Sequence, residues 1–273
     1  MMLNSVSLCM IVKNEEKNIG LLLDAVCPIL EQVVIVDTGS TDKTLEILED
    51  RRQKYSCLSI EHFKWIDDFA AARNYAFSFA TQEWVMFLDG DDYINPDDLF
   101  KFKDNILGKD LSVDCYFLDY IYGQLPDGTP SCVLGRERFI RRSKNPKWVG
   151  AIHEVISTSG MNICHFKHLK VIHKRDGKNI EPGRNLRILA KEYERDPNNA
   201  RTAYYYGKEL FDHSDMRGIK VLEAYVENFS HKYYDDHVNA LFRLGQHYLS
   251  TKQYDKALNA AHQIYTVDSS RQR

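Results

Sequence analysis

The chain has 273 residues, of which 44% are hydrophobic and 12% aromatic, so it is long enough to bury the core of one or two domains. Its formal net charge of -3 argues against a dedicated nucleic-acid binder, because such domains are normally basic. The six cysteines form no C-x-x-C pair, and we expect neither a cleaved leader nor a membrane span. These features predict a soluble, cytoplasmic protein with reduced thiols and no nucleic-acid partner, and they leave peripheral membrane attachment open.

Strand and helix patterns alternate from the start of the chain up to Ala80. Val6–Val12 is apolar and is followed by apolar residues at helical spacing in Ile19–Val26. A second buried strand, Val33–Val36, leads into turn and helix-capping residues, and Ser59–Phe63 with Phe69–Ala80 predicts a third strand and helix. Strands separated by helices of this length predict a parallel sheet of right-handed βαβ units.

The run Trp84–Leu88 consists of large apolar residues and stops in the acidic segment Asp89–Asp92. Such a run is typical of a strand buried on both faces. Asp37 also follows a predicted strand, and ligands bind at the carboxyl ends of the strands in open α/β sheets. Clustered carboxylates there suit Mg²⁺ or Mn²⁺ carrying a diphosphate, so the pattern predicts a nucleotide-diphosphate site. An acidic loop before a helix is the alternative.

The pattern changes after Asn95–Asp98, a helix start with proline at its first position. Val113–Tyr122 and Ser131–Ile140 predict two strands joined by the turn Pro126–Thr129, which would be an antiparallel addition to the sheet. A basic stretch follows, for which a solvated face is favoured over contact with phosphate or an acceptor. Its members are Arg136, Arg138, Arg141, Arg142, Lys144 and Lys147.

From about Glu181 the chain has a helical pattern. Gly207 and Gly245 each lie on an aromatic-rich predicted helix that a second helical segment follows, and aligning them carries Ile219 onto Ala257. This self-similarity predicts tetratricopeptide-like helix-turn-helix repeats. Because two stacked repeats normally need neighbours or caps, we expect this region to form a homodimer, to lean on the preceding domain or to belong to a longer polypeptide.

Four ordered segments together resemble family 2 glycosyltransferases of the GT-A fold: Ser7–Glu16, Val34–Thr44, Ala72–Ala76 and Phe87–Asp92. The continuation through Trp148–Glu154 and His173 resembles the subgroup with a tetratricopeptide-like tail. The resemblance implies an α/β GT-A domain over residues 1–180 and an all-α helical-repeat region over residues 181–273. It also implies metal-dependent transfer of a hexosyl or N-acetylhexosaminyl group from a nucleotide-sugar donor, with UDP favoured, to a saccharide, lipid-linked or peptide acceptor.

The resemblance also implies roles around the donor. Asp37 resembles the residue that hydrogen-bonds the nucleotide base, and a carboxylate acceptor suits the N3–H of uracil. Asp89 and Asp91 match a D-x-D motif that holds ribose and the metal, Mn²⁺ or Mg²⁺, and His173 is a further predicted metal ligand. The other predicted donor contacts are Ile11, Val12, Lys13 and Arg73.

Glu154 is the predicted general base of an inverting transfer, since a carboxylate can take the acceptor proton as the new bond forms. The alternative is an ion pair with Arg138 or Arg141. If Glu154 is not the base, Asp119 and His153 are the next residues to consider, or the mechanism retains configuration and needs no such base.

Three further assignments have alternatives. Arg73 would anchor helix to loop if it paired with Asp67 or Asp68, and Asp92 has a weaker claim on the metal than its neighbours. A zinc site is disfavoured because the spacing of its candidate ligands matches no structural zinc pattern. Those candidates are Cys164, His165, His168 and His173.

The sequence is also compatible with two other classes of protein. A sugar-phosphate nucleotidyltransferase would also place acids at strand ends, but Lys13–Glu16 lacks the glycine-rich or basic phosphate loop that it needs. A non-catalytic repeat scaffold would explain the helical tail. The presence of Asp37, Asp89, Asp91 and Glu154 in one chain argues against a scaffold.

Overall fold

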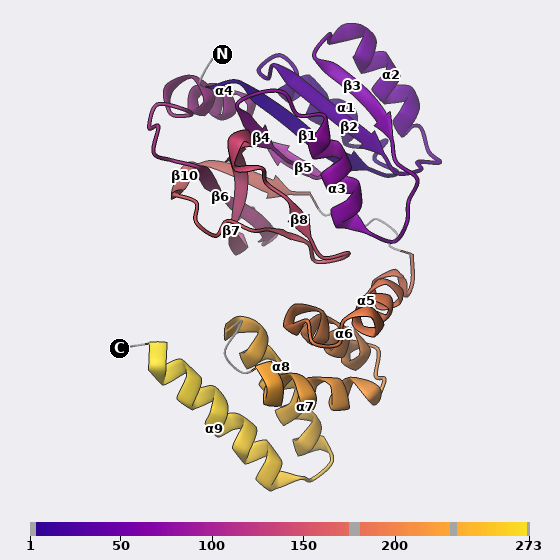
Figure 1. The fold of residues 1–273 in the computed structure, drawn as a ribbon, viewed down its shortest axis with the longest axis vertical. Helices are drawn as coiled ribbons and strands as arrows, with labels where there is room; N and C mark the ends of the chain where they lie inside the picture. Colours follow the sequence, from indigo (N-terminus) through magenta and orange to yellow (C-terminus); the bar gives the residue numbers. More distant parts are fainter. Residues whose placement is uncertain (1–3, 175–180, 230–233, 272–273) are drawn as a thin grey trace. The chain divides into compact units, whose positions relative to one another are not determined.

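The computed structural model describes residues 4–174, 181–229 and 234–271 (Figure 1). The chain divides into two compact units, Met1–Asn179 and Ile180–Arg273. The predicted division after residue 180 falls at the edge of segment 175–180, which lies outside the described residues. In the described parts of the chain, no helix combines the length and the apolar character needed to cross a membrane.

The first unit is built on one large mixed sheet. Its parallel half contains β1 (Val6–Val12), β2 (Gln32–Asp37), β3 (Leu58–His62) and β4 (Trp84–Met86). Its other half contains β5 (Asp92–Ile94), β6 (Cys115–Gln124), β7 (Pro130–Arg141) and β10 (Ile163–His173). The strand order is β3-β2-β1-β4-β7-β6-β10-β5, and β7 is antiparallel to both of its neighbours. The predicted parallel sheet and its antiparallel addition are therefore confirmed.

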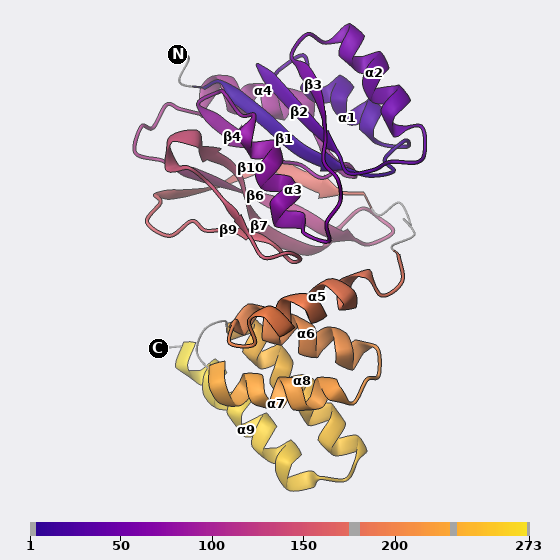
Figure 2. The same ribbon diagram turned by 45° about the vertical axis from the view of Figure 1, so that its right-hand side comes forward.

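Helices cover both faces of the parallel half. They are α1 (Ile19–Val26), α2 (Thr44–Lys54), α3 (Phe69–Ser78) and α4 (Pro96–Asn105). Leu8 and Met10 of β1 belong to the same core cluster as α1, α2 and α4, whereas Cys9 clusters with Ala76 of α3. In Figure 2, α3 crosses in front of the sheet. Because neighbouring strand residues point to opposite faces, burial of both faces explains the unbroken apolar sequence of β1.

The strand that precedes the acidic segment is shorter than predicted. β4 ends at Met86, although Phe87 and Leu88 are buried. The carbonyl oxygen of Phe87 accepts a hydrogen bond from Nη1 of Arg138 at 3.1 Å. The backbone thus leaves the sheet while its side chains stay in the core, so an apolar run alone overestimates the length of the strand.

The second unit is helical, as predicted. It contains α5 (Arg184–Arg195), α6 (Ala200–Asp212), α7 (Arg217–Phe229), α8 (Tyr234–Ser250) and α9 (Tyr254–Arg271). The two predicted helix pairs are α6 with α7 and α8 with α9. A Cβ atom at Gly207 would lie 2.9 Å from the side chain of Leu222, so this glycine permits the close approach of α7 to α6. A Cβ atom at Gly245 would meet Ala260 at an ordinary 3.8 Å.

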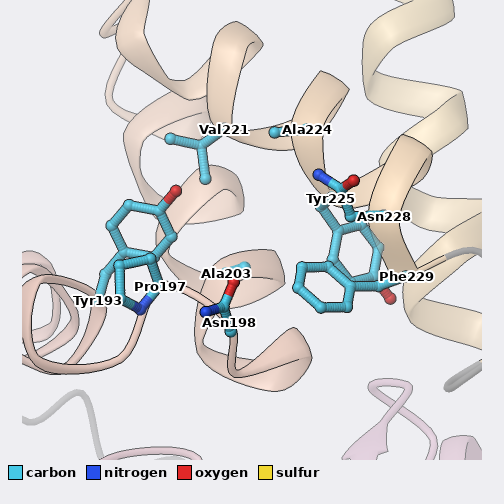
Figure 3. A pocket seen from close by; sticks show the side chains of 9 residues that line it. All are labelled: Tyr193, Pro197, Asn198, Ala203, Val221, Ala224, Tyr225, Asn228 and Phe229. Atoms are coloured by element: carbon cyan, nitrogen blue, oxygen red, sulfur yellow. The ribbon is translucent and has the colours of Figure 1, made fainter.

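A small pocket of about 160 Å³ lies among α5, α6 and α7. Figure 3 shows Tyr193 and Pro197 facing Tyr225 and Phe229 across it. Its other lining residues are Asn198, Ala203, Val221, Ala224 and Asn228. The pocket is smaller than the roughly 300 Å³ at which sites for drug-sized ligands begin, so it has room for a small group only.

Candidate active site

The site begins in the loops that follow β1 and β2 at the carboxyl edge of the sheet. Asn14 adopts a left-handed backbone conformation with φ 56°. Its amide donates to Oγ of Ser40 at 3.0 Å, and its Oδ1 accepts from the amide of Thr41 at 2.8 Å. Glu16 and Asp42 add a third contact, from amide to carboxylate, at 3.1 Å. The two loops are thus held together as one surface.

Asp37 ends β2 and is buried, with 4% of its surface exposed. Its Oδ2 accepts hydrogen bonds from the amides of Gly39 at 2.9 Å and Ser40 at 3.2 Å. On the neighbouring strand, Val12 pairs with Asp37 and Ile11 pairs with Val36. These contacts fix the carboxylate beside the end of β1.

The three β1-side residues predicted to contact the donor differ in exposure. Val12 is a core residue, whose carbonyl oxygen accepts hydrogen bonds from both the amide and the hydroxyl of Thr38 at 3.0 Å. Ile11 is half-buried, and Lys13 is exposed. Of the three side chains, that of Lys13 is therefore the most accessible from solvent.

The acidic segment forms a tight turn. The amide of Asp92 donates to the carbonyl oxygen of Asp89 at 3.0 Å, and Oδ2 of Asp92 accepts from the amide of Asp89 at 3.0 Å. A Cβ atom at Gly90 would lie 2.6 Å from the buried side chain of Glu15, so a larger residue here would force Glu15 to move. Asp91 occupies the third position of this turn.

Arg73 of α3 joins two predicted site residues. Its Nη2 donates to Oδ1 of Asp89 and its Nε donates to Oε1 of Glu154, both at 2.7 Å. Burial alone would lower the pKa of Arg73, but the two carboxylates outweigh it and raise the pKa. Burial likewise acts to raise the pKa of Asp89, but the charge of Arg73 prevails and holds it well below its usual range. Asp89 is therefore an ionised carboxylate.

The alternative partners considered for Arg73 and Glu154 are engaged elsewhere. Asp68 caps α3 by accepting from the amide of Ala71 at 2.8 Å, and Asp67 accepts from the indole of Trp65 at 3.1 Å. Arg138 pairs with Asp92, and Arg141 pairs with Glu83. Glu154 pairs with Arg73 instead of with either of these arginines.

Asn74, the residue after Arg73, has a matching role. Its Nδ2 donates to the carbonyl oxygen of Trp148 at 2.9 Å, and its Oδ1 accepts from the amide of Trp148 at 2.9 Å. Trp148 begins β8 (Trp148–Val149), which pairs with β9 (Val155–Ile156), and Glu154 lies just before β9. Arg73 and Asn74 therefore both connect α3 to the segment that carries Glu154.

A group able to hold a divalent metal consists of Asp91, Asp92 and His173, whose ligand atoms all lie within 4.8 Å of one another. Nδ1 of His173 is 3.6 Å from Asp91 and 3.7 Å from Asp92. This buried nitrogen has no hydrogen-bond partner in the described parts of the chain. The contact with Asp92 raises the pKa of His173 against the opposing effect of burial. Two carboxylates and an imidazole form a donor set that fits Mn²⁺ or Mg²⁺.

The structure does not bring every predicted metal residue into that group. Asp89 contacts Arg73 instead, and the third member is Asp92, whose predicted claim on the metal is weaker. Within the described residues, Cys164, His165 and His168 belong to no metal-binding group.

Two residues beside the site were not predicted to take part in it. The hydroxyl of Tyr120 donates to Oδ1 of Asp92 at 3.0 Å, and Nη1 of Arg138 lies 3.3 Å from Oδ2 of Asp92. Burial, with the charges of Asp92 and Asp89, raises the pKa of Tyr120 and keeps the hydroxyl protonated. The prediction of a solvated basic face is wrong for Arg138 and Arg141, which are 1% and 8% exposed. The strand pattern of the surrounding sequence was the one available signal of their burial.

Comparison with known proteins gives one match within the first unit and others that extend into the second. The model of glycosyl transferase family 2 matches residues 7–166, more than half of the chain. The SPbeta prophage-derived glycosyltransferase SunS of Bacillus subtilis (strain 168) is 26% identical over 232 residues, which cover 80% of this chain and 52% of SunS. The chain therefore spans about half the length of this curated relative.

The fold also matches a solved structure. The crystal structure of S. aureus TarS 1–349 in complex with UDP-GlcNAc has a TM-score of 0.53 at 18% identity, and the match covers 98% of this chain and 92% of that chain. Curated TarS of Staphylococcus aureus (strain Mu50 / ATCC 700699), a poly(ribitol-phosphate) β-N-acetylglucosaminyltransferase, is 38% identical over 91 residues, or 32% of this chain and 16% of TarS. The predicted fold, a GT-A domain followed by helices, is confirmed.

Proposed function

Because the chain belongs to glycosyl transferase family 2, we propose that residues 1–180 form a domain that moves a sugar from a UDP-sugar to an acceptor nucleophile, with inversion. The observation that carries this proposal is the guanidinium of Arg73, which contacts both Asp89 and Glu154 at 2.7 Å. A donor-side acid and an acceptor-side carboxylate are thereby held in a fixed relation, and fixed orientation of reacting groups supplies much of the rate in group transfer.

For the metal, we assign Asp91 and His173 as the main ligands of Mn²⁺ or Mg²⁺, with Asp89 as a further candidate through its Oδ2. The buried Nδ1 of His173 supports this assignment, because it has no hydrogen-bond partner among the described residues and lies 3.6 Å from Asp91. Asp92 is assigned a positioning role, because its two oxygens already accept hydrogen bonds from Tyr120 and from the amide of Asp89. An ion bound by Asp91 and His173 would neutralise negative charge that develops on the departing diphosphate.

Glu154 is the proposed general base. Arg73 engages its Oε1, which leaves Oε2 to accept the proton of the acceptor group. As that proton moves, the acceptor atom bonds to the anomeric carbon, the bond from this carbon to the diphosphate oxygen breaks, and the electron pair leaves with the diphosphate. The side chain of Glu154 is 12% exposed, so it is shielded from bulk water and still accessible to an acceptor.

The donor is proposed to lie along the ends of β1 and β2. Asp37 accepts from the N3–H of uracil, and Ile11, Val12 and Lys13 line the neighbouring strand end. The UDP-GlcNAc bound to TarS, a protein of similar fold, supports a uracil nucleotide. Asp89 contacts ribose or metal through Oδ2, because Arg73 engages Oδ1.

The acceptor class remains a saccharide, a lipid-linked intermediate or a peptide. Residues 181–273 are proposed to be a tetratricopeptide-like region that presents the acceptor or forms a homodimer. Light scattering on the full chain would test whether it is a homodimer.

The small pocket between Tyr193 and Tyr225 supports contact with the acceptor, since it is lined by both aromatic and carboxamide side chains. We also propose a cytoplasmic location, because all six cysteines are free thiols.

A screen of UDP-sugars with the full chain tests this function. We expect slow release of UDP from at least one UDP-sugar in the presence of Mn²⁺ or Mg²⁺, and none after chelation. Formation of a UDP-sugar from UTP and a sugar phosphate would instead indicate a nucleotidyltransferase. Failure to bind UDP with either metal would contradict the proposal and favour a scaffold.

A further inference from the structure

Arg138 of β7 is buried in an unusual way. It is 1% exposed, and its Nε has no hydrogen-bond partner among the residues that the structure describes. Its guanidinium carbon lies 4.7 Å from the ring centre of Phe87 and 4.6 Å from that of Tyr120. Buried ion pairs contribute little net stability because desolvation offsets their attraction. The burial of Arg138 therefore calls for an explanation other than stability.

The strand pairing explains how Arg138 reaches its position. Tyr116 of β6 pairs with Phe139, and the next residue, Phe117, pairs with Glu137. Arg138 is consequently an extra, unpaired residue on β7, which is the definition of a β-bulge. Bulges redirect a side chain and are frequent beside active sites. Here the bulged residue is Arg138, and its side chain reaches the end of β4 and the acidic turn.

Arg138 contacts the residue just after β4 and the last residue of this turn. Its Nη1 donates to the carbonyl oxygen of Phe87 at 3.1 Å and lies 3.3 Å from Oδ2 of Asp92. The same Oδ2 accepts from the amide of Asp89 at 3.0 Å and so closes the turn that carries Asp91. In the pairing of β5 with β10, Asp92 stands opposite His173. Asp92 thus touches both elements that supply the proposed metal ligands.

We propose that Arg138 is a positioning residue for the metal site. Through Asp92 it fixes the turn Asp89–Asp92, and it thereby sets the relation between Asp91 and His173. This inference rests on the proposed function, in which Asp91 and His173 hold the divalent ion. Without Arg138, the Asp92 carboxylate loses its charged partner, and Phe87, which leads into the turn, loses its hydrogen bond to β7.

Arg141 offers a matched control on the same strand. It is also buried, its Nη1 lies 2.8 Å from Oε1 of Glu83, and its guanidinium carbon lies 4.5 Å from the ring centre of Trp84. These partners are at the start of β4, whereas Arg138 contacts the residue just beyond its end. Arg141→Met therefore removes the ion pair of a second buried arginine, whose partner Glu83 is 24% exposed, without touching the acidic turn.

The test uses calorimetric titration of UDP into the full chain, with and without Mn²⁺. Arg138→Met is expected to weaken Mn²⁺-dependent UDP binding by about 10- to 100-fold, as loss of an outer-shell partner typically does. Binding without metal should not change. Hydrogen exchange should also accelerate in segment 87–92 of Arg138→Met. Arg141→Met should change neither quantity, even if both variants lose thermal stability.

A second variant keeps the inference testable if Arg138→Met does not fold. Tyr120→Phe keeps the ring and removes one hydrogen bond to Asp92, so it should weaken Mn²⁺-dependent UDP binding less than Arg138→Met. Arg138→Lys should bind UDP with Mn²⁺ more tightly than Arg138→Met, because it keeps the positive charge beside Asp92. Equal effects of the two arginine-to-methionine variants, or unchanged exchange in segment 87–92, would overturn the inference. If Arg138→Met does not fold, normal Mn²⁺-dependent UDP binding by Tyr120→Phe would overturn the inference. If UDP binding by the wild-type chain did not depend on Mn²⁺, the proposed metal site would be overturned instead. Hydrogen exchange in segment 87–92 would then still test whether Arg138 fixes the turn.

Discussion

The two units bury different kinds of side chain. Beside the acidic turn, the first unit buries Arg73, Asp92 and Arg138 in a network of ion pairs and hydrogen bonds. The core cluster of the second unit consists of alanine, leucine, isoleucine and tyrosine side chains. Charges are expensive to bury and contribute geometry more than stability, whereas apolar burial mainly stabilises. Substitutions in the first network should therefore alter chemistry, and substitutions in the second core should alter stability.

The largest effect is expected from Glu154→Gln. The amide keeps the size of the side chain but cannot accept a proton at neutral pH, so transfer should fall by about 10²- to 10⁴-fold. The affinities for UDP and Mn²⁺ should stay near those of the wild type, because the loss concerns the chemical step. Transfer rate, UDP affinity and melting temperature should be measured on the same preparation.

Glu83→Gln is the matched control for that change. Glu83 pairs with Arg141 at 2.8 Å, as Glu154 pairs with Arg73 at 2.7 Å, so both substitutions weaken one ion pair with a buried arginine. Only Glu154→Gln should slow transfer. Near-normal transfer by Glu154→Gln would move the base to another residue, with Asp119 and His153 next, or would favour a retaining mechanism.

Asp91→Asn should have the next largest effect. It removes a charged ligand from the proposed metal site, and it does so in a loop. Mn²⁺-dependent UDP binding should therefore weaken by about 100-fold, which is the largest loss typical of substitutions around a metal ligand. The melting temperature should hardly change. Asp104→Asn, at an exposed position of α4, is the control for loss of one negative charge. UDP binding by Asp91→Asn that equals the wild type with Mn²⁺ would refute the assignment.

Arg73→Lys should reduce the transfer rate by roughly 10- to 100-fold, the order of loss that a misplacement of about 1 Å can produce. Lysine keeps the charge but not the planar fork that serves Asp89 and Glu154 together. The KM for the donor should change much less than kcat, since the nucleotide contacts remain.

Arg51→Lys is the control for the exchange of arginine for lysine. Arg51 of α2 makes a two-point contact with Asp24, from Nε at 3.0 Å and from Nη2 at 2.9 Å. It lies outside the proposed site, so its substitution should leave kcat unchanged. A similar loss of kcat in both variants would show that the Arg73 result reflects general destabilisation.

The sequence predicts this site unevenly, and the reason is the range of the contacts involved. Val6–Val12 and Ile19–Val26 have the predicted bounds because their apolar periodicity is a local property. The pairing of Arg73 with Glu154 spans 81 residues, so no local pattern could reveal it. The sequence alone favours a solvated face for Arg138, and this prediction is wrong because the direction of the side chain depends on a bulge that forms only when β7 pairs with β6.

The smallest effects are expected in the second unit, from the pair Gly207→Ala and Gly245→Ala. A methyl group at Gly207 would lie 2.9 Å from Leu222 and 3.1 Å from Val221, so the helices must separate, which costs about 1–3 kcal/mol of stability. At Gly245 the nearest neighbour is Ala260 at 3.8 Å, and the better helix propensity of alanine should stabilise by up to about 1 kcal/mol. Chemical denaturation should therefore give opposite signs for two identical substitutions, while Mn²⁺-dependent UDP binding stays unchanged in both. Stabilisation by Gly207→Ala would mean that α6 and α7 are not closely packed, and weaker UDP binding in either variant would show that the second unit also shapes the donor site.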